Sequence, residues 1–570
     1  MDNHPNNNSV QNQEPNQTFS PQQPTAPTSN PVASMPPTEP GETPPVAKPI
    51  AVGAEKSHKS KSGVLVLILV IVMATVGGYL LYKHSTKKAA PVAKTVTKQD
   101  IPLLRIGVGD GPVNSFYPAG PNTSGVTFTD NQIFEALVGW QNGTKVVPML
   151  ATSWTNPDDS TWIFTIRSNV QFHTGNALTA NDVKYSLDKF KDTAYGGGAG
   201  LGDTIKSVEV VSPTKVKITT DGPDPILLNR LASLFIVDSK GTKQNDAING
   251  TGPYIVKPAT DPSKDTVTDL VPFTGYWGGH VYTKELKISA VTDANGAITQ
   301  LQKHQIDVFE QFTSLSEVKT LKDDNINTVA EESSTVDMLV LNTVKTGSPL
   351  ASLPFRQALN IGISRSAILK AADLQGTSLG QFVVKEIPGY DASIAVPTQD
   401  VAKAKQLIAS SGVKTPTLTL SYTTDASNDK AVKEIQTELA AIGVTLKLDP
   451  QADVGVLADS FFAGKLDMLF LGYSADLFDA SDPFTTLFQN PSTFDNQAVD
   501  DLLTKANQTL DGAKHITLLQ QAAQKLNDNV PAIPLFSRTG FYAQTSTSYT
   551  LHRDIPGAGL GVYLWKVYQQ

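Results

Sequence analysis

The second half of the chain carries a regular alternation of two hydrophobic periods. Between 401 and 412 apolar residues recur at helical spacing and stop at Gly412, and over 418–422 they alternate at every second position, as in a half-buried strand. The same alternation of helical and strand periods predicts a helix over 428–442, a strand over 444–448, a helix over 454–463 and a strand over 468–471. Strands separated by helices of this length pair in parallel, so the pattern predicts an α/β lobe.

Shorter patterns predict the elements of the first half. Apolar residues over 103–108 indicate a strand, and Thr179 with Asp182 three residues later fits a capping box at the start of an amphipathic helix. The runs 208–211 and 216–219 flank a proline-containing turn and predict a β-hairpin.

Three segments precede this folded part. Residues 1–62 are dominated by Asn, Gln, Pro, Ser and Thr, which predicts a disordered tail. The uncharged apolar run 63–82 is long enough, at about 1.5 Å per residue, to cross a hydrocarbon layer of roughly 30 Å. It lies far from the N-terminus and lacks a small-residue cleavage site, so we expect an uncleaved signal anchor, followed by a tether over 83–100. Lysines on both sides leave its orientation open from charge alone.

Length and composition narrow the class of protein. A chain of 570 residues exceeds what one core supports, so at least two lobes are expected. The formal net charge of -8 offers no basic field for nucleic acid. The absence of cysteine excludes disulfides, thiolate metal sites and a lipidated N-terminal cysteine, and the eight histidines are scattered. No phosphate-binding loop, zinc helix or nucleophile elbow occurs, so we predict neither an enzyme nor a cofactor or metal site.

The predicted α/β lobe indicates where a ligand would bind. Ligands of such lobes lie beyond the carboxyl ends of the strands. The segment 472–483, Gly-Tyr-Ser-Ala-Asp-Leu-Phe-Asp-Ala-Ser-Asp-Pro, follows the last predicted strand and is the candidate binding loop.

Several sequence blocks occur in a fixed order. A dense stretch over 133–190 includes the segments PMLATSW and FHTGNALTANDVKYS, and later blocks are GTGPY at 250–254, YW at 276–277, QID at 305–307 and FRQAL at 355–359. In this order they resemble the family 5 extracellular solute-binding proteins, which include oligopeptide-, dipeptide- and nickel-binding components of ABC importers. The resemblance extends over nearly all of 103–570.

The resemblance implies a two-lobed, periplasmic-binding-protein-like (type II) α/β fold with an enlarged first lobe. Lobe I is expected over 101–312, lobe II over 313–537, and a C-terminal return to lobe I over 538–570. The chain would then cross between the lobes near Phe312 and near Ser537, which predicts a hinge.

The resemblance also assigns roles to residues of the candidate loop. In peptide-binding members an acidic residue of this loop holds the ligand's ammonium group, a role that falls to Asp476 with Asp479 as the alternative. The family's Asp-Pro is delayed here to Asp482-Pro483, so the spacing departs from the family pattern where ligand choice is made. A purely structural role, capping turns, is the competing interpretation. Gly252 allows close backbone approach, so its loop could reach the cleft or form a turn inside the lobe, with Tyr254 packing beside the cleft. Weaker candidates for cleft walls, each also compatible with packing, are Trp277, Asn342 and Tyr473.

Together these observations predict a membrane-anchored extracytoplasmic solute-binding protein. It would capture peptides in an interlobe cleft and deliver them to the permease of an ABC importer, with a single-pass anchor in the cell membrane and the C-terminal binding domain outside the cytoplasm. A binder of nickel or another metal chelate, or a ligand-sensing receptor using the same fold, is the alternative.

Overall fold

The computed structural model describes residues 98–109, 124–141, 143–191, 200–241, 248–257, 267–291, 293–414, 416–549, 551 and 564–569. The predicted tail over 1–62, the predicted membrane helix over 63–82 and all of the tether except 98–100 lie outside these residues. Within the described ranges, no helix combines the length and apolar character that a membrane crossing requires.

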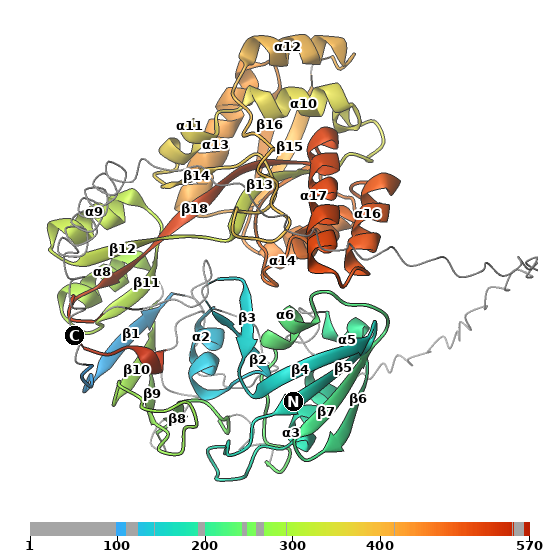
Figure 1. Ribbon diagram of the computed structural model, residues 1–570. Helices are drawn as coiled ribbons and strands as arrows, with labels where there is room; N and C mark the ends of the chain where they lie inside the picture. Colours follow the sequence, from blue (N-terminus) through green and yellow to red (C-terminus); the bar gives the residue numbers. More distant parts are fainter. Residues whose placement is uncertain are drawn as a thin grey trace, which may run out of the picture. The chain divides into compact units, whose positions relative to one another are not determined.

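A mixed sheet of twelve strands organises the fold, and strand β18 (Ala532–Gln544) belongs to both of its halves. The strands of the first half are β1 (Leu104–Val108), β8 (Tyr254–Val256), β9 (Val267–Pro272), β10 (Leu286–Ala290), β11 (Val308–Phe312) and β12 (Asn327–Glu332). Those of the second half are β13 (Thr335–Leu341), β14 (Gly376–Ser378), β15 (Thr417–Thr423), β16 (Thr445–Gln451) and β17 (Met468–Ser474). Figure 1 shows β18 running from beside β13 to beside β11 and β12.

The first half of the sheet, with the elements that pack on it, forms the first lobe. It also contains a small sheet of β2 (Val138–Gln141) and β3 (Lys145–Pro148) and a four-stranded sheet in the order β4 (Ala151–Asp158), β5 (Thr161–Ile166), β7 (Lys215–Thr220) and β6 (Ile205–Ser212). Its helices are α2 (Ser124–Ile133), α3 (Ala180–Phe190), α5 (Leu201–Thr204), α6 (Leu227–Ala232), α8 (Ala294–Gln302) and α9 (Leu315–Asp323), and the 3-10 turn η2 (Leu564–Lys566) packs in the same core.

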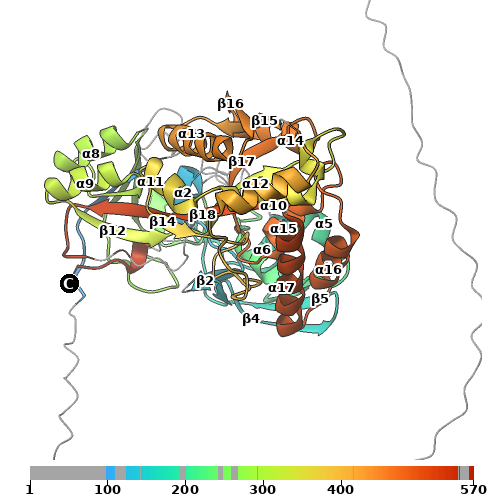
Figure 2. The ribbon, with the colours of Figure 1, turned by 90° about the horizontal axis from the view of Figure 1, so that it is seen from above.

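The second half forms the second lobe, a three-layer α/β/α sandwich. One face of its sheet is covered by α10 (Leu353–Gly362), α11 (Arg365–Ala371), α12 (Val401–Ser410) and α13 (Ala426–Ala441), with η1 (Pro349–Ala351) beside them. The other face is covered by α14 (Val454–Phe462), α15 (Ser481–Phe488), α16 (Gln497–Asn507) and α17 (Gly512–Asn529). Figure 2 shows α16 and α17 side by side on this second face.

The periodic patterns of the sequence predict these elements well. β15 pairs in parallel with both β16 and β17, as the alternation of helices and strands requires. The hairpin of β6 and β7 is confirmed, and Thr179 and Asp182 form the predicted capping box, with Thr179 donating from its N–H to the Asp182 carboxylate at 2.7 Å. Gly412 and Gly443 follow their helices at φ of 75° and 90°, the left-handed region that glycine tolerates.

The chain crosses between the lobes at two segments that are hydrogen-bonded to each other. Phe312, where the first crossing was predicted, packs in one core with α8, α9 and the end of β18, and the chain leaves that core at Ser333, after β12. Ser537, the predicted second crossing, donates its hydroxyl to the carbonyl of Ser333 at 2.6 Å. Next to it, Arg538 donates to both carboxylate oxygens of Asp337, at 2.7 and 2.8 Å. The crossing is therefore fixed by a bidentate ion pair.

A buried glutamate joins three of the sequence blocks of the first lobe. The Glu135 side chain accepts hydrogen bonds from Thr251 Oγ1 at 2.8 Å, Tyr276 Oη at 3.0 Å and Trp277 Nε1 at 2.7 Å. Burial raises the pKa of Glu135 to about 7, even though these three donors favour its ionised form. The GTGPY and YW blocks thus meet at one carboxyl group, which fixes the loop after α2.

We expect Arg538→Ala to destabilise the fold by about 3–5 kcal/mol, because Asp337 would stay buried without its cation. Unfolding in guanidinium chloride measures this change. Lys319→Ala, which removes an exposed i,i+4 ion pair with Asp323, is the control and should change stability by no more than about 0.5 kcal/mol. An equal effect of the two substitutions would contradict the role assigned to the buried pair.

Glu135→Gln should become more stable relative to the wild type as pH rises. The pKa of Glu135 is raised to about 7 in the folded protein, so the folded state resists the ionisation that the unfolded chain undergoes near pH 4.3. Ionising Glu135 therefore costs stability increasingly between about pH 4.5 and about pH 7, whereas glutamine stays neutral. Denaturant unfolding of both proteins across this range measures the difference, and parallel stability curves would refute the prediction.

Candidate functional site

The candidate binding loop, residues 472–483, connects the end of β17 with the first turn of α15. Because β15, β16 and β17 are parallel, their carboxyl ends lie at one edge of the sheet. Asp425 and Asp453 follow β15 and β16 at this edge, and both accept backbone N–H bonds as N-caps of α13 and α14. The acidic residues of the 472–483 loop therefore lie at the edge where ligands of α/β folds bind.

Asp479 is bound inside the second lobe. Its side chain is 5% exposed and lies 3.0 Å from Nε2 of His515 through Oδ2. Its other oxygen, Oδ1, accepts the N–H of Ser481 at 2.9 Å. Both oxygens of Asp479 are thus engaged by the protein, so this carboxylate has little capacity left for a ligand.

Asp476, three residues before Asp479, is exposed where Asp479 is buried. Its side chain is exposed, and among the described residues its carboxylate accepts no hydrogen bond. The surrounding protein nevertheless removes enough water to raise the pKa of Asp476 to about 6, and the nearby Asp482 adds to the rise. The carboxylate of Asp476 is thus exposed, partly desolvated and without a hydrogen-bond donor among the described residues, whereas that of Asp479 is occupied.

Tyr473 and Asp482 brace the loop. Tyr473, half-buried, donates its hydroxyl to Oδ1 of Asp482 at 3.2 Å, and Oδ2 of Asp482 accepts the N–H of Leu477 at 3.4 Å. Burial, followed by the charge of Asp482, raises the pKa of Tyr473 above its ordinary value. The delayed Asp482 therefore closes the loop on itself, which is how the chain accommodates its unusual spacing.

The same loop contacts the first lobe. Asn229 of α6 donates to the carbonyl of Leu477 at 2.7 Å, and the ring of Phe478 meets Trp140 of β2 edge-on, with centroids 4.7 Å apart. Leu477 packs in the core of the first lobe, and Trp140 in a core of the second. Phe478 adopts a left-handed φ of 50°, a costly conformation for a bulky residue. The two residues that follow Asp476 thus make direct contacts with the first lobe.

Three other predicted site residues lie inside the first lobe. The N–H of Gly252 donates to the carbonyl of Ile133 at 2.9 Å, and a Cβ on Gly252 would come within 2.6 Å of that carbonyl group. Glycine is therefore required at this position by close backbone packing. Tyr254 is fully buried in the core. Trp277 is partly exposed, binds Glu135, and carries the guanidinium of Arg167 at 4.0 Å from its ring centroid.

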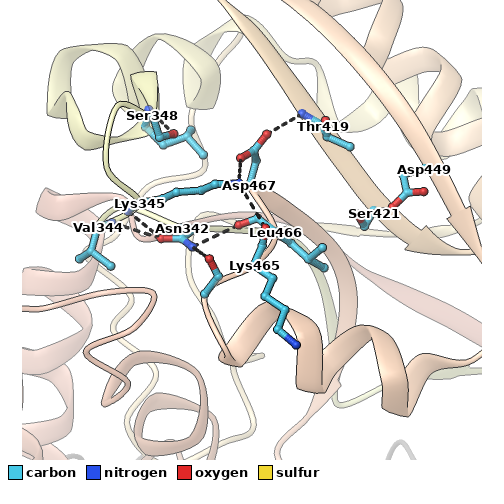
Figure 3. A network of polar contacts seen from close by, with 12 residues as sticks. Asn342, Val344, Lys345, Ser348, Thr419, Ser421, Asp449, Lys465, Leu466 and Asp467 are labelled. Carbon is cyan, nitrogen blue, oxygen red and sulfur yellow. Dashed lines mark hydrogen bonds and ion pairs between the residues drawn. The ribbon is translucent and has the colours of Figure 1, made fainter.

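Asn342 lies at the opposite edge of the second-lobe sheet. β13 is antiparallel to β17, so Leu341 pairs with Met468 at the start of β17, about 20 Å from the end of that seven-residue strand. The Asn342 amide is used within the lobe: it donates to the carbonyls of Gly464 and Leu466, each at 3.1 Å, and accepts the N–H of Lys345 at 3.0 Å. Figure 3 shows Asn342 between Leu466 and Lys345. The structure therefore does not bring Asn342 together with Asp476.

Residues that sequence patterns did not single out hold the loop in place. His515, Trp140 and Asn229 lie in segments distant from the loop along the chain, and none was a candidate site residue, although Trp140 falls within the dense stretch 133–190. The pairing of a lone histidine on the apolar face of α17 with an aspartate of the loop is visible only in the folded chain. Among the described residues, no group of three or more His, Cys, Asp or Glu is arranged to hold a metal ion.

Comparison with known proteins places this geometry in a family. Residues 145–495 match the model of the bacterial extracellular solute-binding proteins, family 5 Middle. Di/tripeptide-binding protein 1 of Pseudomonas aeruginosa is 26% identical over 492 residues, which cover 77% of this chain and 89% of that protein. Glutathione-binding protein GsiB of Escherichia coli K12 is 26% identical over 462 residues, covering 73% and 87% of the two chains.

Solved structures show the same two-lobed α/β fold. An ABC transporter-associated periplasmic binding protein from Helicobacter pylori, in complex with the peptide STSA, superposes with a TM-score of 0.68 at 24% identity, covering 83% of this chain and 98% of that one. A protein from Campylobacter jejuni in complex with Ni(L-His) superposes with a TM-score of 0.66 at 22% identity, covering 82% and 100%. The family match spans more than half of the chain and confirms the prediction of a binding protein rather than an enzyme. The chain belongs to the bacterial extracellular solute-binding proteins of family 5.

Proposed function

We propose that this protein captures peptides by binding their N-terminal ammonium group at Asp476 and delivers them to an ABC importer. The observation that carries the proposal is the contrast within one loop: Asp479 is buried and satisfied, whereas the Asp476 carboxylate is reachable and accepts no hydrogen bond among the described residues. The peptide-binding names of the Pseudomonas and Helicobacter relatives support the same ligand class.

The surroundings of the Asp476 carboxylate suit an ammonium group. Charge-assisted hydrogen bonds between an ammonium and a carboxylate are stronger than neutral ones, and exclusion of water strengthens them further. Without a ligand, Asp476 is partly desolvated and close to Asp482, which raises its pKa. The positive charge of a bound ammonium offsets both the desolvation of Asp476 and its repulsion by Asp482, so ligand binding compensates a cost that the empty site carries.

Capture also involves both lobes. The loop that contains Asp476 contacts α6 and β2 of the first lobe, and β18 with the Ser333 segment connects the lobes. A peptide that contacts both lobes favours the closed arrangement, which the importer would recognise as the loaded state. The anchor predicted over 63–82 would hold the binding domain outside the cytoplasm and near its permease, raising its effective concentration there.

A metal chelate is the second candidate ligand, because the Campylobacter relative was solved with a nickel–histidine complex. A histidine ligand that chelates nickel through its amino group has no free ammonium to offer Asp476. Native mass spectrometry of the purified binding domain separates the candidates by the mass of what it carries.

Asp476→Asn should weaken binding of trialanine about ten- to one-hundred-fold, because a charge-assisted hydrogen bond is replaced by a neutral one. Isothermal titration of trialanine and of N-acetyl-trialanine measures the change, and the acetylated peptide should bind the wild type as weakly as trialanine binds the variant. Asp453→Asn is the matched control, since it removes the same charge at the same sheet edge and keeps an N-cap. Equal affinity of the wild type for both peptides would contradict the ammonium site.

The affinity for trialanine should fall as pH drops below about 6. The pKa of Asp476 is raised to about 6 in the empty site, and only the ionised carboxylate attracts the ammonium, so acidification protonates the site and releases the peptide. Well below the pKa we expect close to ten-fold weaker binding per pH unit. Titrations between about pH 4.5 and pH 7.5 test this, and Asp476→Asn should lose the acid limb. An unchanged acid limb in the variant would assign it to another group.

A further inference from the structure

His515 is the residue of α17 that reaches the binding loop from inside the second lobe. Its ring is buried, with Nδ1 2.9 Å from the carbonyl oxygen of Ala506 in α16 and Nε2 3.0 Å from Oδ2 of Asp479. A carbonyl oxygen only accepts hydrogen bonds, and so does an ionised carboxylate. Both ring nitrogens must therefore donate, which only the imidazolium form can do.

The charges around His515 agree with this form. Burial alone lowers the pKa of His515, but the hydrogen bond and charge of Asp479, the carbonyl of Ala506 and the charge of Asp224 together raise it above its ordinary value. Asp224 comes from the first lobe, where Arg230 forms an ion pair with it at 3.0 Å. Pro388 and Gly389, which pack on the other side against Ala480 and Leu519, carry no charge.

A second histidine, His173, shows what the carboxylate adds. Its Nδ1 lies 3.3 Å from the carbonyl oxygen of Ile248, with the N–H of Gly250 also directed at it at 3.4 Å, and its Nε2 lies 3.0 Å from the carbonyl of Gly252. Both carbonyls are neutral, and burial lowers the pKa of His173 despite them. The contact with the carboxylate of Asp479 is thus what distinguishes His515 from His173.

We propose that His515 is a positioning residue for ligand capture, whose imidazolium holds Asp479 and thereby fixes the loop in the conformation that leaves Asp476 free to bind an ammonium group. The inference rests on the proposed function of Asp476. Asp479 also accepts the N–H of Ser481, and the N–H of Ala480 donates to Pro388, so releasing the carboxylate loosens the loop from its C-terminal side. Phe478, whose left-handed φ of 50° is strained, would then relax to a less strained backbone conformation.

The test compares His515→Gln, Asp479→Asn and the double variant with Leu526→Ala. Leu526 is a fully buried residue of the same helix and the same core, so Leu526→Ala destabilises the lobe without contacting the loop. We expect His515→Gln to weaken trialanine binding about ten-fold at neutral pH, because fixing even one loosened residue on binding costs that much. Asp479→Asn should do the same, the double variant should be no weaker than either single one, and Leu526→Ala should bind as the wild type does.

Hydrogen exchange of the ligand-free protein provides a readout that needs no peptide. The amides of 477, 478, 480 and 481 are hydrogen-bonded within or beside the loop, so His515→Gln should speed their exchange more than Leu526→Ala does at matched global stability. If the wild type does not bind trialanine, the proposed ligand is wrong, and the exchange data still decide the role of His515. Unchanged exchange in His515→Gln, or equal loss of affinity in Leu526→Ala, would overturn the inference.

Discussion

The ion pair between Arg538 and Asp337 is the interaction on which the arrangement of the two lobes depends. It lies where β18 passes from one half of the twelve-stranded sheet to the other, beside the hydrogen bond from Ser537 to Ser333. Asp337 is buried, so its charge is tolerated only while the guanidinium stays in register. The side chain of Arg538 also donates to Asn428 at 2.8 Å, which connects the crossing to α13. The guanidinium group of Arg538 therefore holds one crossing segment against both β13 and α13.

The binding loop is held by contacts of three kinds, and this leaves one acidic residue open. Inside the second lobe, His515 engages Asp479; within the loop, Tyr473 and a backbone amide engage Asp482; and the first lobe contacts Leu477 and Phe478. Each contact involves a residue within six positions of Asp476 and none uses its carboxylate. A loop with several fixed points presents its remaining polar group at a defined position, which lowers the ordering cost that a ligand must overcome.

The sequence predicted the elements and their order because hydrophobic periodicity and capping are local properties. β15 to β17 and the capping box at Thr179 follow from residues close together in the chain. The difference in bonding between Asp476 and Asp479 was not local, since Asp479 is bound by a histidine 36 positions away. The glycine and aromatic blocks suggested a cleft, yet Gly252 packs on Ile133 and Trp277 binds Glu135, because a buried carboxyl group also gathers such residues. Asn342 was a weaker candidate for a cleft wall, and antiparallel pairing of β13 with β17 places it at the sheet edge opposite the candidate loop.

Leu477 of the second lobe packs in the core of the first, and Trp140 of the first lobe packs in a core of the second. This arrangement affects how fast a ligand can enter. Each lobe completes its core with a side chain from the other, and both side chains are under a tenth exposed. Separating the lobes would wet a leucine and a tryptophan together, at a cost of roughly 2–3 kcal/mol for each large apolar group. The empty protein would then spend only a small fraction of its time open, and the apparent association rate would be reduced by that fraction. Such a protein would retain its ligand well and take it up slowly.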